Sequence, residues 1–329
     1  MRICIFGAGA VGGHFAARLA AAGHSVSVIA RGEYLAAIRE RGLVVLHGDE
    51  RLEARVKASD RPAELGPQDI VISTLKANAL PSLAAGIGPL LGPETAVVFA
   101  QNGIPWWYAS GLAPSRPTPP DLSRLDPDGA LARSVGVERT LGAVIWSANT
   151  VIEPGVIRNG TPKSNLLAVG EPDDRISPRL TALRAALEQA GIGSPVTPDI
   201  RQTIWGKLVQ NLAYSTLGLL LGTGIDVIQE DPALSEMARR LTAEGTAIAA
   251  AHGVTAEQRS RPSTAPGNAA NRHKPSILQD YERGRPLELD AMIMMPLAFA
   301  RAANVSTPSL DIAAAIAAGR AVEKGLYTR

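Results

Sequence analysis

The first thirty residues alternate between apolar and polar positions in a way that predicts a strand, a turn, a helix and a second strand. Residues 2–6 are a short apolar run, residues 11–22 are rich in Ala and Leu, and residues 25–30 alternate and include three β-branched side chains. Gly23 follows the helical segment, at the position where a glycine commonly ends a helix. Because parallel strands need such a crossover, this stretch predicts a βαβ unit.

Similar patterns continue to about residue 190. They predict further strands at residues 42–46, 51–56, 69–75, 95–100, 140–147, 156–158 and 165–169, and helices at residues 81–91 and 178–190. Strands that alternate with helices are typical of α/β proteins with helices on both faces of a parallel sheet. We therefore predict a doubly wound sheet that includes the two short strands on either side of the turn at residues 47–50.

The pattern changes at residue 199, after which helical spacing dominates and strand signals almost disappear. The length of 329 residues also favours two domains, since single cores rarely exceed about 250–300 residues. We predict an N-terminal α/β domain over residues 1–197 and an all-helical domain over residues 198–329. Residues 110–130 contain five prolines, and we interpret them as an ordered excursion or a mobile loop within the first domain.

Composition and charge argue against several classes of function. The net charge is +2 and no run of five like charges occurs, which argues against a nucleic-acid partner. Cys4 is the single cysteine, so it excludes an internal disulfide and a zinc site of paired cysteines, and we expect it to pack as a small hydrophobe. We expect no metal. Neither a signal peptide nor an apolar run of about 18 residues is present, which predicts a soluble cytoplasmic protein without a membrane partner.

A glycine motif lies between the first predicted strand and helix. Residues 7–13 read Gly-Ala-Gly-Ala-Val-Gly-Gly. The first glycine permits a tight turn, the second lets the backbone approach a pyrophosphate, and the third lets helix and strand pack closely. The helix N-terminus adds free N–H groups and partial positive charge. This context favours a dinucleotide site over a simple packing turn. The residues predicted to bind the cofactor here are Gly7, Gly9, Ala10, Val11 and Gly12.

Three polar residues at the ends of predicted strands extend this site. Arg31 follows the second strand, where an acid would bind the ribose 2′-hydroxyl of NAD, whereas a guanidinium suits the 2′-phosphate of NADP. Lys76 and Asn102 follow two later strands, and ligands of doubly wound sheets bind outside these carboxyl ends. We predict NADP as the cofactor, with Arg31, Lys76 and Asn102 among its contacts. For each residue the alternative is an ordinary solvated surface group.

The segment at residues 204–215 places polar groups inside an apolar helical pattern. Lys207 and Asn211 are four residues apart and share one face, which Ser215 extends by a turn. When hydride adds to a ketone, negative charge develops on the oxygen, and an ammonium group can stabilise and protonate it. A lysine that snorkels to the surface is the alternative. A second cluster lies at residues 274–280. A third contains Glu288 and Asp290, which could also be first-turn acids of a helix.

These motifs together resemble the ketopantoate reductase family (2-dehydropantoate 2-reductases). The segments that carry the resemblance are residues 7–13, Thr74-Leu75-Lys76-Ala77, Gln101-Asn102-Gly103-Ile104, Trp205-Gly206-Lys207-Leu208 with Asn211, residues 274–280, and Glu288-Leu289-Asp290. The resemblance covers nearly the whole chain. It implies an N-terminal Rossmann domain, an all-helical C-terminal domain, and an active site between them that transfers hydride from NADPH to ketopantoate on the route to pantothenate and coenzyme A.

The resemblance also implies roles for individual residues. Lys207 corresponds to the catalytic lysine that protonates the carbonyl oxygen, and Glu288 to the acid that binds the substrate hydroxyl and supports catalysis. Asn102, Asn211 and Ser276 correspond to substrate contacts. Lys76 corresponds to a lysine beside cofactor and substrate, and Arg31 to the residue at the adenosine 2′-phosphate.

Two features depart from the family pattern. Ser215 stands where many members carry a second asparagine, and we include it among the substrate-binding residues. The segment Pro105-Trp106-Trp107-Tyr108 and the Pro-rich excursion are longer than the family minimum. Both features favour a second hypothesis, a related 2-keto acid reductase or the reverse 2-hydroxy acid dehydrogenase.

Further alternatives stay open. One is an NADP-binding sensor without catalysis, which would need neither Lys207 nor Glu288. Another is a relative of the 6-phosphogluconate or glycerol-3-phosphate dehydrogenases, which fits the segments around Ser276 and Glu288 poorly. The apolar C-terminal helices are compatible with a homodimer or with packing inside one chain.

Overall fold

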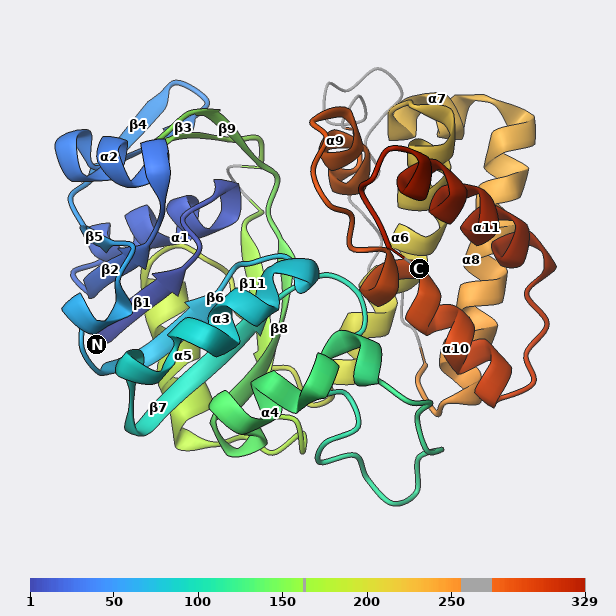
Figure 1. Ribbon diagram of the computed structural model, residues 1–329, viewed down its shortest axis with the longest axis horizontal. Helices are drawn as coiled ribbons and strands as arrows, with labels where there is room; N and C mark the ends of the chain where they lie inside the picture. Colours follow the sequence, from blue (N-terminus) through green and yellow to red (C-terminus); the bar gives the residue numbers. More distant parts are fainter. Residues whose placement is uncertain (162–163, 256–273, 329) are drawn as a thin grey trace. The chain divides into compact units, whose positions relative to one another are not determined.

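The computed structural model describes residues 1–161, 164–255 and 274–328, and these form two compact units (Figure 1). Unit 1 comprises Met1–Gln101 and Asp126–Ile200, and unit 2 comprises Asn102–Leu125 and Arg201–Arg329. By its contacts, the first part of the Pro-rich excursion therefore groups with the helices. The division at residues 197 and 198 remains a prediction about domains.

Unit 1 contains a parallel sheet with one antiparallel edge strand. Among the described residues, seven strands form this sheet in the order β11-β8-β7-β6-β1-β2-β5, and only β11 runs antiparallel to its neighbour. The strands of this main sheet are β1 (Arg2–Phe6), β2 (Ser25–Ile29), β5 (Lys57–Ser59), β6 (Gln68–Ser73), β7 (Leu91–Ala100), β8 (Thr140–Trp146) and β11 (Leu166–Gly170). The predicted α/β class with a doubly wound sheet is confirmed.

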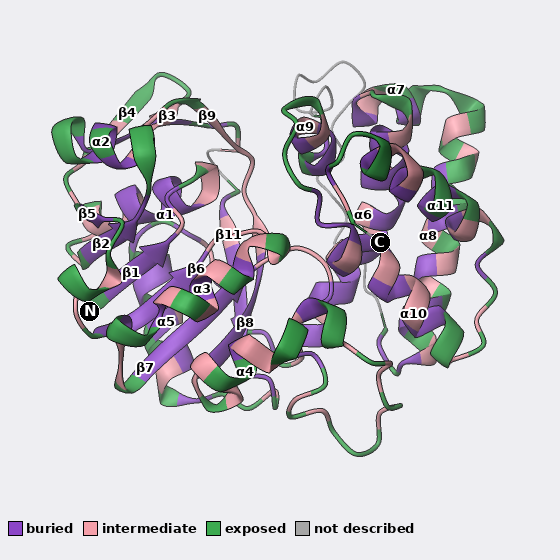
Figure 2. Ribbon diagram, in the orientation of Figure 1, coloured by how far each residue is buried: buried purple, intermediate pink, exposed green. Residues whose placement is uncertain are grey.

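Helices cover both faces of the main sheet. The helices of unit 1 are α1 (Ala10–Ala21), α2 (Gly32–Arg41), α3 (Leu80–Gly86), α4 (Ala130–Ser134) and α5 (Pro178–Gln189). The crossover through α1 leads from β1 to β2, whereas that through α3 leads from β6 to β7, in the opposite direction along the sheet. Because such crossovers are almost always right-handed, α1 and α3 are expected on opposite faces, as Figure 1 shows. The central strands are consequently buried on both sides (Figure 2).

A second, smaller sheet corrects one prediction. The two strands on either side of the turn at residues 47–50 do not join the main sheet. They pair with two others in the order β4-β3-β10-β9, formed by β3 (Leu43–His47), β4 (Glu50–Ala54), β9 (Asn149–Glu153) and β10 (Val156–Asn159). This sheet packs on α1, whose other side contacts β1 and β2. Helix α1 is buried between two sheets, which explains its apolar composition.

Several element limits also differ from the sequence-based prediction. The helix expected over residues 81–91 ends at Gly86, because Gly88 and Pro89 follow and Pro89 has no N–H to continue the ladder. Helix α2 and strands β5 and β9 were not predicted. Helix α2 is rich in charged residues, and β5 and β9 span only three and five residues, so tertiary contacts rather than hydrophobic periodicity decide them.

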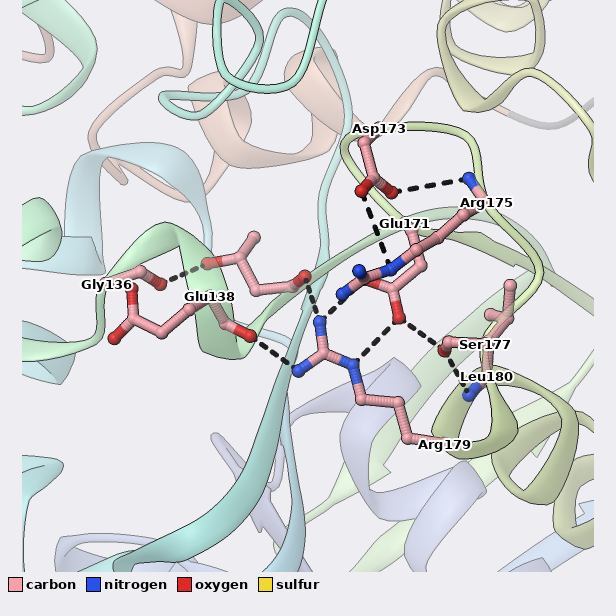
Figure 3. A network of polar contacts seen from close by, with 9 residues as sticks. Gly136, Glu138, Glu171, Asp173, Arg175, Ser177, Arg179 and Leu180 are labelled. Atoms are coloured by element: carbon pink, nitrogen blue, oxygen red, sulfur yellow. Dashed lines mark hydrogen bonds and ion pairs between the residues drawn. The ribbon is translucent and has the colours of Figure 1, made fainter.

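An ion pair with a buried carboxylate lies at the end of β11 in the main sheet (Figure 3). The Glu171 carboxylate, 1% exposed, follows β11 and accepts two hydrogen bonds from the Arg179 guanidinium of α5, at 2.8 and 2.6 Å. Ser177, the N-cap of α5, donates to the same carboxylate. The hydrogen bonds to this carboxylate raise the pKa of the Arg179 guanidinium above its ordinary value. Arg179 also donates to the Glu138 carbonyl and thereby holds the loop before β8.

Unit 2 is helical, as predicted from residue 199 onward. Its elements are α6 (Ile200–Leu221), α7 (Ile225–Glu230), α8 (Pro232–Ala251), α9 (Ser276–Glu282), a π-helical turn (Asp290–Met294, here the π-turn), α10 (Met295–Ala302) and α11 (Pro308–Glu323). Helix α6 packs against α8 at Gly245, where a Cβ would lie 3.2 Å from Leu212. Among the described helices, none is long and apolar enough to cross a bilayer.

Candidate active site

The glycine turn in unit 1 has the geometry that its sequence predicts. Gly7 has φ +107°, which other residues rarely adopt, and its N–H donates to the Ile29 carbonyl at the end of β2. A Cβ on Gly12 would lie 2.1 Å from the Gly7 carbonyl oxygen, so no larger residue fits there. The turn and the first residues of α1 are therefore held in close contact with the ends of β1 and β2.

Thr74 supports this turn and was not singled out from the sequence. Its hydroxyl donates to the Gly7 carbonyl oxygen at 2.6 Å, and its own N–H donates to the Phe6 carbonyl. The residue directly follows β6, the strand next to β1. The sequence places Thr74 at a strand end, two residues before Lys76, and this position could have indicated a role. The contact of its hydroxyl with Gly7, however, depends on tertiary structure.

The N-terminus of α1 suits a bound pyrophosphate. Gly9 is its N-cap, and no side chain caps the first N–H groups. The first turn contains no acidic residue, so it presents only N–H groups and the positive end of the helix dipole. A Cβ on Gly9 would meet no atom within 4 Å, so this glycine is not required for internal packing. Open space beside uncapped N–H groups fits the phosphates of a dinucleotide, with Ala10 and Val11 in the first turn.

Arg31 and Lys76 lie at the strand ends where they were expected. Arg31 is exposed, is the N-cap of α2, and forms no ion pair with any described residue. Its neighbour Ala30 is buried and hydrogen-bonded to the Ser59 carbonyl, which fixes the backbone before it. Lys76 is half-buried and precedes a single 3-10 turn after β6. Both belong to unit 1, together with the glycine turn.

Helix α6 carries three of the predicted side chains in unit 2. Lys207, Asn211 and Ser215 are spaced by four residues in an unbroken helix, so they share one face. Lys207 and Asn211 are half-buried and Ser215 is buried. The opposite positions Trp205 and Leu208 are fully buried in the core of the unit. The helix thus presents a polar stripe on an otherwise apolar surface.

Ser276 begins α9 beside the same helix. A Cβ on Gly218 of α6 would lie 2.8 Å from the Pro275 ring, so the two helices approach closely one turn beyond Ser215. Ser276 itself is exposed. The structure therefore brings the predicted substrate contacts of α6 and α9 to neighbouring places within unit 2.

Glu288 precedes the π-turn and is held by backbone contacts on both sides. Its carbonyl accepts the Met292 N–H, and the N–H of Leu287 donates to the Leu326 carbonyl of the C-terminal tail. The side chain is 9% exposed. Asn102 also belongs to unit 2 and directly follows the last residue of unit 1 on that part of the chain. Every predicted substrate or catalytic residue of this group lies in unit 2.

Asp290 anchors a network that sequence reasoning did not predict. Its carboxylate accepts the Tyr327 hydroxyl at 2.7 Å and pairs with the Arg124 guanidinium at 3.1 Å, and Arg124 also donates to Tyr327. Asp290 is the first residue of the π-turn. It therefore occupies the position of a first-turn acid, as the alternative interpretation of its sequence expected. The contacts additionally tie the Pro-rich excursion and the C-terminal tail to the turn beside Glu288.

Two buried groups in unit 1 are chemically inert. Cys4 is fully buried in β1, and burial raises the pKa of its thiol to about 12, so it packs as a small hydrophobe, as predicted. His14 of α1 is fully buried between the sheets and accepts a hydrogen bond from Arg18. Within the described parts of the chain, no group of three or more His, Cys, Asp or Glu side chains could hold a metal ion.

Comparisons with known proteins match both the N-terminal and the C-terminal part of the chain. The model of "Ketopantoate reductase PanE/ApbA" matches residues 3–106, and the model of its C-terminal part matches residues 199–321. The chain belongs to the ketopantoate reductase family. It is therefore an oxidoreductase that uses a nicotinamide dinucleotide.

Similar proteins cover the chain from end to end. A 2-dehydropantoate 2-reductase from Mesorhizobium japonicum is 39% identical over 100% of both chains. A solved structure from Ralstonia solanacearum, provisionally named a ketopantoate reductase, has a TM-score of 0.85 at 36% identity over 99% of both chains. The 2-dehydropantoate 2-reductase from Geobacter metallireducens has a TM-score of 0.80 at 28% identity over 96% of this chain and 99% of its own.

Proposed function

We propose that this protein reduces ketopantoate to pantoate with NADPH. The strongest support is the full-length identity of 39% to a relative named 2-dehydropantoate 2-reductase. The polar stripe of α6, with Lys207 and Asn211 on one face, supplies groups suited to a keto acid. A cytoplasmic location, without membrane or nucleic-acid partners, fits this activity.

Unit 1 would hold the cofactor. The turn formed by Gly7, Gly9 and Gly12 and the first N–H groups of α1 would bind the pyrophosphate, and Lys76 would lie at the carboxyl end of β6 near the reactive part. NADPH, when bound, supplies the hydride. Arg31 would pair with the adenosine 2′-phosphate, for which an exposed guanidinium at a helix N-cap is suited.

Unit 2 would hold and protonate the substrate. Hydride addition makes the keto oxygen an alkoxide, and the Lys207 ammonium would stabilise that charge and give its proton to the oxygen. Glu288 would accept a hydrogen bond from the substrate hydroxyl. The amides of Asn102 and Asn211 and the hydroxyls of Ser276 and Ser215 can bind carboxylate and hydroxyl groups without adding charge.

A related 2-keto acid reductase is the second candidate, and Ser215 is the observation that favours it. Ser215 is buried on the polar face of α6, where a shorter side chain than asparagine leaves more room for the substrate. The Trp-rich segment no longer favours this candidate, because Trp107 is 1% exposed and its ring lies beside the Arg201 guanidinium in the core of unit 2. It serves packing.

The deciding experiment follows NADPH absorbance with the purified protein and ketopantoate, pyruvate, 2-ketoisovalerate or benzoylformate. A preference for ketopantoate of at least about tenfold in kcat/KM supports the proposal. Preference for another keto acid would move the protein to the second candidate, and the absence of any turnover would contradict both.

The cofactor assignment has its own test. The Arg31→Gln variant is expected to raise the Kd for NADPH about tenfold, which corresponds to roughly 1.4 kcal/mol for one charge-assisted pair. The Kd for NADH should change less than twofold, since NADH has no 2′-phosphate. Fluorescence titration measures both. Equal weakening of the two cofactors would contradict the role of Arg31.

A further inference from the structure

The turn at Asn102 and Gly103 is docked on the π-turn through one backbone hydrogen bond. The Ile104 N–H donates to the Ala291 carbonyl oxygen at 2.8 Å. Gly103 has φ +83°, and a Cβ there would lie 2.4 Å from the same oxygen and 2.5 Å from the Ala291 carbonyl carbon. Only glycine allows the chain to approach this closely.

The Ala291 carbonyl can accept a hydrogen bond from outside its helix because of the π-turn and a proline. Within the turn, the Met295 N–H bonds to the Asp290 carbonyl, five residues back rather than four. The next bond in this register would join residue 296 to Ala291, but Pro296 has no N–H. The helix therefore leaves the Ala291 carbonyl without an internal donor, and Ile104 supplies one from another part of the chain.

The chain that follows Ile104 is also fixed. Arg201 of α6 is fully buried and donates to the carbonyls of Tyr108 and Ser110 at 2.8 and 2.6 Å. Trp205 donates its indole N–H to the Tyr108 hydroxyl at 2.8 Å. Hydrogen bonds consequently hold the segment that begins at Asn102 against α6, the helix that carries Lys207.

We infer that Gly103, Ala291 and Pro296 are positioning residues that fix Asn102 and Glu288 relative to each other. Asn102 lies two residues before the donor of this hydrogen bond, and Glu288 lies three residues before its acceptor. The inference rests on the proposed function, because it assigns both side chains to the substrate. A shift of about 1 Å in such a group can lower turnover by roughly 100-fold.

The test compares Gly103→Ala with a matched control, Gly222→Ala. Gly222 also has positive φ, at +70°, but a Cβ there meets no atom within 4 Å. Both variants place a Cβ on a residue with positive φ, and only Gly103→Ala pushes against Ala291. We expect Gly103→Ala to lower kcat about 10- to 100-fold and to raise KM for the keto acid, with the Kd for NADPH unchanged. Gly222→Ala should stay within twofold of the parent protein.

Hydrogen exchange supplies a readout that does not depend on activity. The Ile104 amide should be protected in the parent protein and in Gly222→Ala, and should exchange at least about tenfold faster in Gly103→Ala. If ketopantoate is not reduced, kinetics are measured with whichever keto acid is turned over. The substrate assignment would then fail while the exchange difference persists, so the two failures are distinguishable.

Pro296→Ala keeps the inference testable if Gly103→Ala does not fold. The alanine restores an N–H that competes for the Ala291 carbonyl within the helix, so kcat should fall about threefold and the Ile104 amide should exchange faster, without loss of thermal stability. Unchanged kinetics in a folded Gly103→Ala or Pro296→Ala protein overturns the inference. Equal losses in Gly103→Ala and Gly222→Ala also overturn it, because strain alone would then explain them.

Discussion

Two glycine turns, one in each unit, are required for the same physical reason but are recognised in different ways. A Cβ on Gly12 would lie 2.1 Å from the Gly7 carbonyl oxygen, and one on Gly103 would lie 2.4 Å from that of Ala291. The first acceptor belongs to the same motif, whereas the second belongs to a helix near the other end of the chain. A sequence motif can therefore explain the first glycine, but only tertiary structure explains the second.

The units also differ in what they offer to ligands. Unit 1 presents mainly backbone N–H groups at the start of α1, supported by packing. Unit 2 presents side chains on α6, α9 and the segment before the π-turn. This difference predicts that substitutions in unit 1 act on stability and cofactor affinity, whereas substitutions in unit 2 act on turnover.

The largest effect is expected for Lys207→Ala. Loss of the ammonium removes the proposed proton donor and the stabilisation of the alkoxide, so kcat should fall about 100-fold or more. The Kd for NADPH should not change. Steady-state kinetics and fluorescence titration measure the two quantities. Lys324→Ala is the control, since this exposed ammonium of the same unit lies over the Tyr281 ring. Near-normal turnover in Lys207→Ala would contradict its catalytic role and the contrast between the units.

The Gly12→Ala substitution tests the packing role assigned to the glycine turn of unit 1. The new Cβ would collide with the Gly7 carbonyl and the Thr74 hydroxyl, and such overpacking costs about 3 kcal/mol of unfolding free energy. Urea denaturation measures this loss. Gly9→Ala is the matched control, because its Cβ meets no protein atom. That variant should retain stability but lose NADPH affinity about tenfold or more. Equal destabilisation by both substitutions would be inconsistent with separate packing and ligand roles.

The smallest predicted effect concerns His14 of unit 1, which should make the free energy of unfolding depend on pH. Burial, followed by the charges of Arg18 and His47, lowers the pKa of His14 to about 3, from about 6.5 in an unfolded chain. The unfolded state therefore binds a proton that the folded state excludes. This contribution to stability is complete above pH 6.5 and decreases as pH falls toward 3, by up to roughly 1.4 kcal/mol per pH unit.

The His14→Gln variant tests this linkage, because glutamine can still accept the hydrogen bond from Arg18 but does not titrate. Unfolding free energies measured at several values between pH 7 and 5 should fall less steeply for the variant than for the parent protein. Parallel pH profiles would show that His14 is protonated without cost in the folded state.

Periodicity predicted most of unit 1 because its central strands are buried on both faces and glycine or proline lies near the ends of its helices. Predictions were wrong where pairing partners decide the structure. The apolar residues around positions 47–50 predicted strands correctly, but β3 pairs with β4 and with β10, which comes from another part of the chain, and not with a strand of the main sheet. The contacts of Thr74, Arg124 and Tyr327 could not be predicted from the sequence, since each residue acts through a partner distant in sequence.

The sequence by itself determined the glycine turn, the place of Arg31 just after β2, and the helical spacing of Lys207, Asn211 and Ser215. These features depend on neighbouring residues and on the repeat of one helix or strand. Tertiary structure alone decided that the Asn102 turn docks on the π-turn and that the first part of the Pro-rich excursion, up to Leu125, groups with unit 2. The physical reason is that an unbonded carbonyl and a missing Cβ become meaningful only when folding brings their partners into contact.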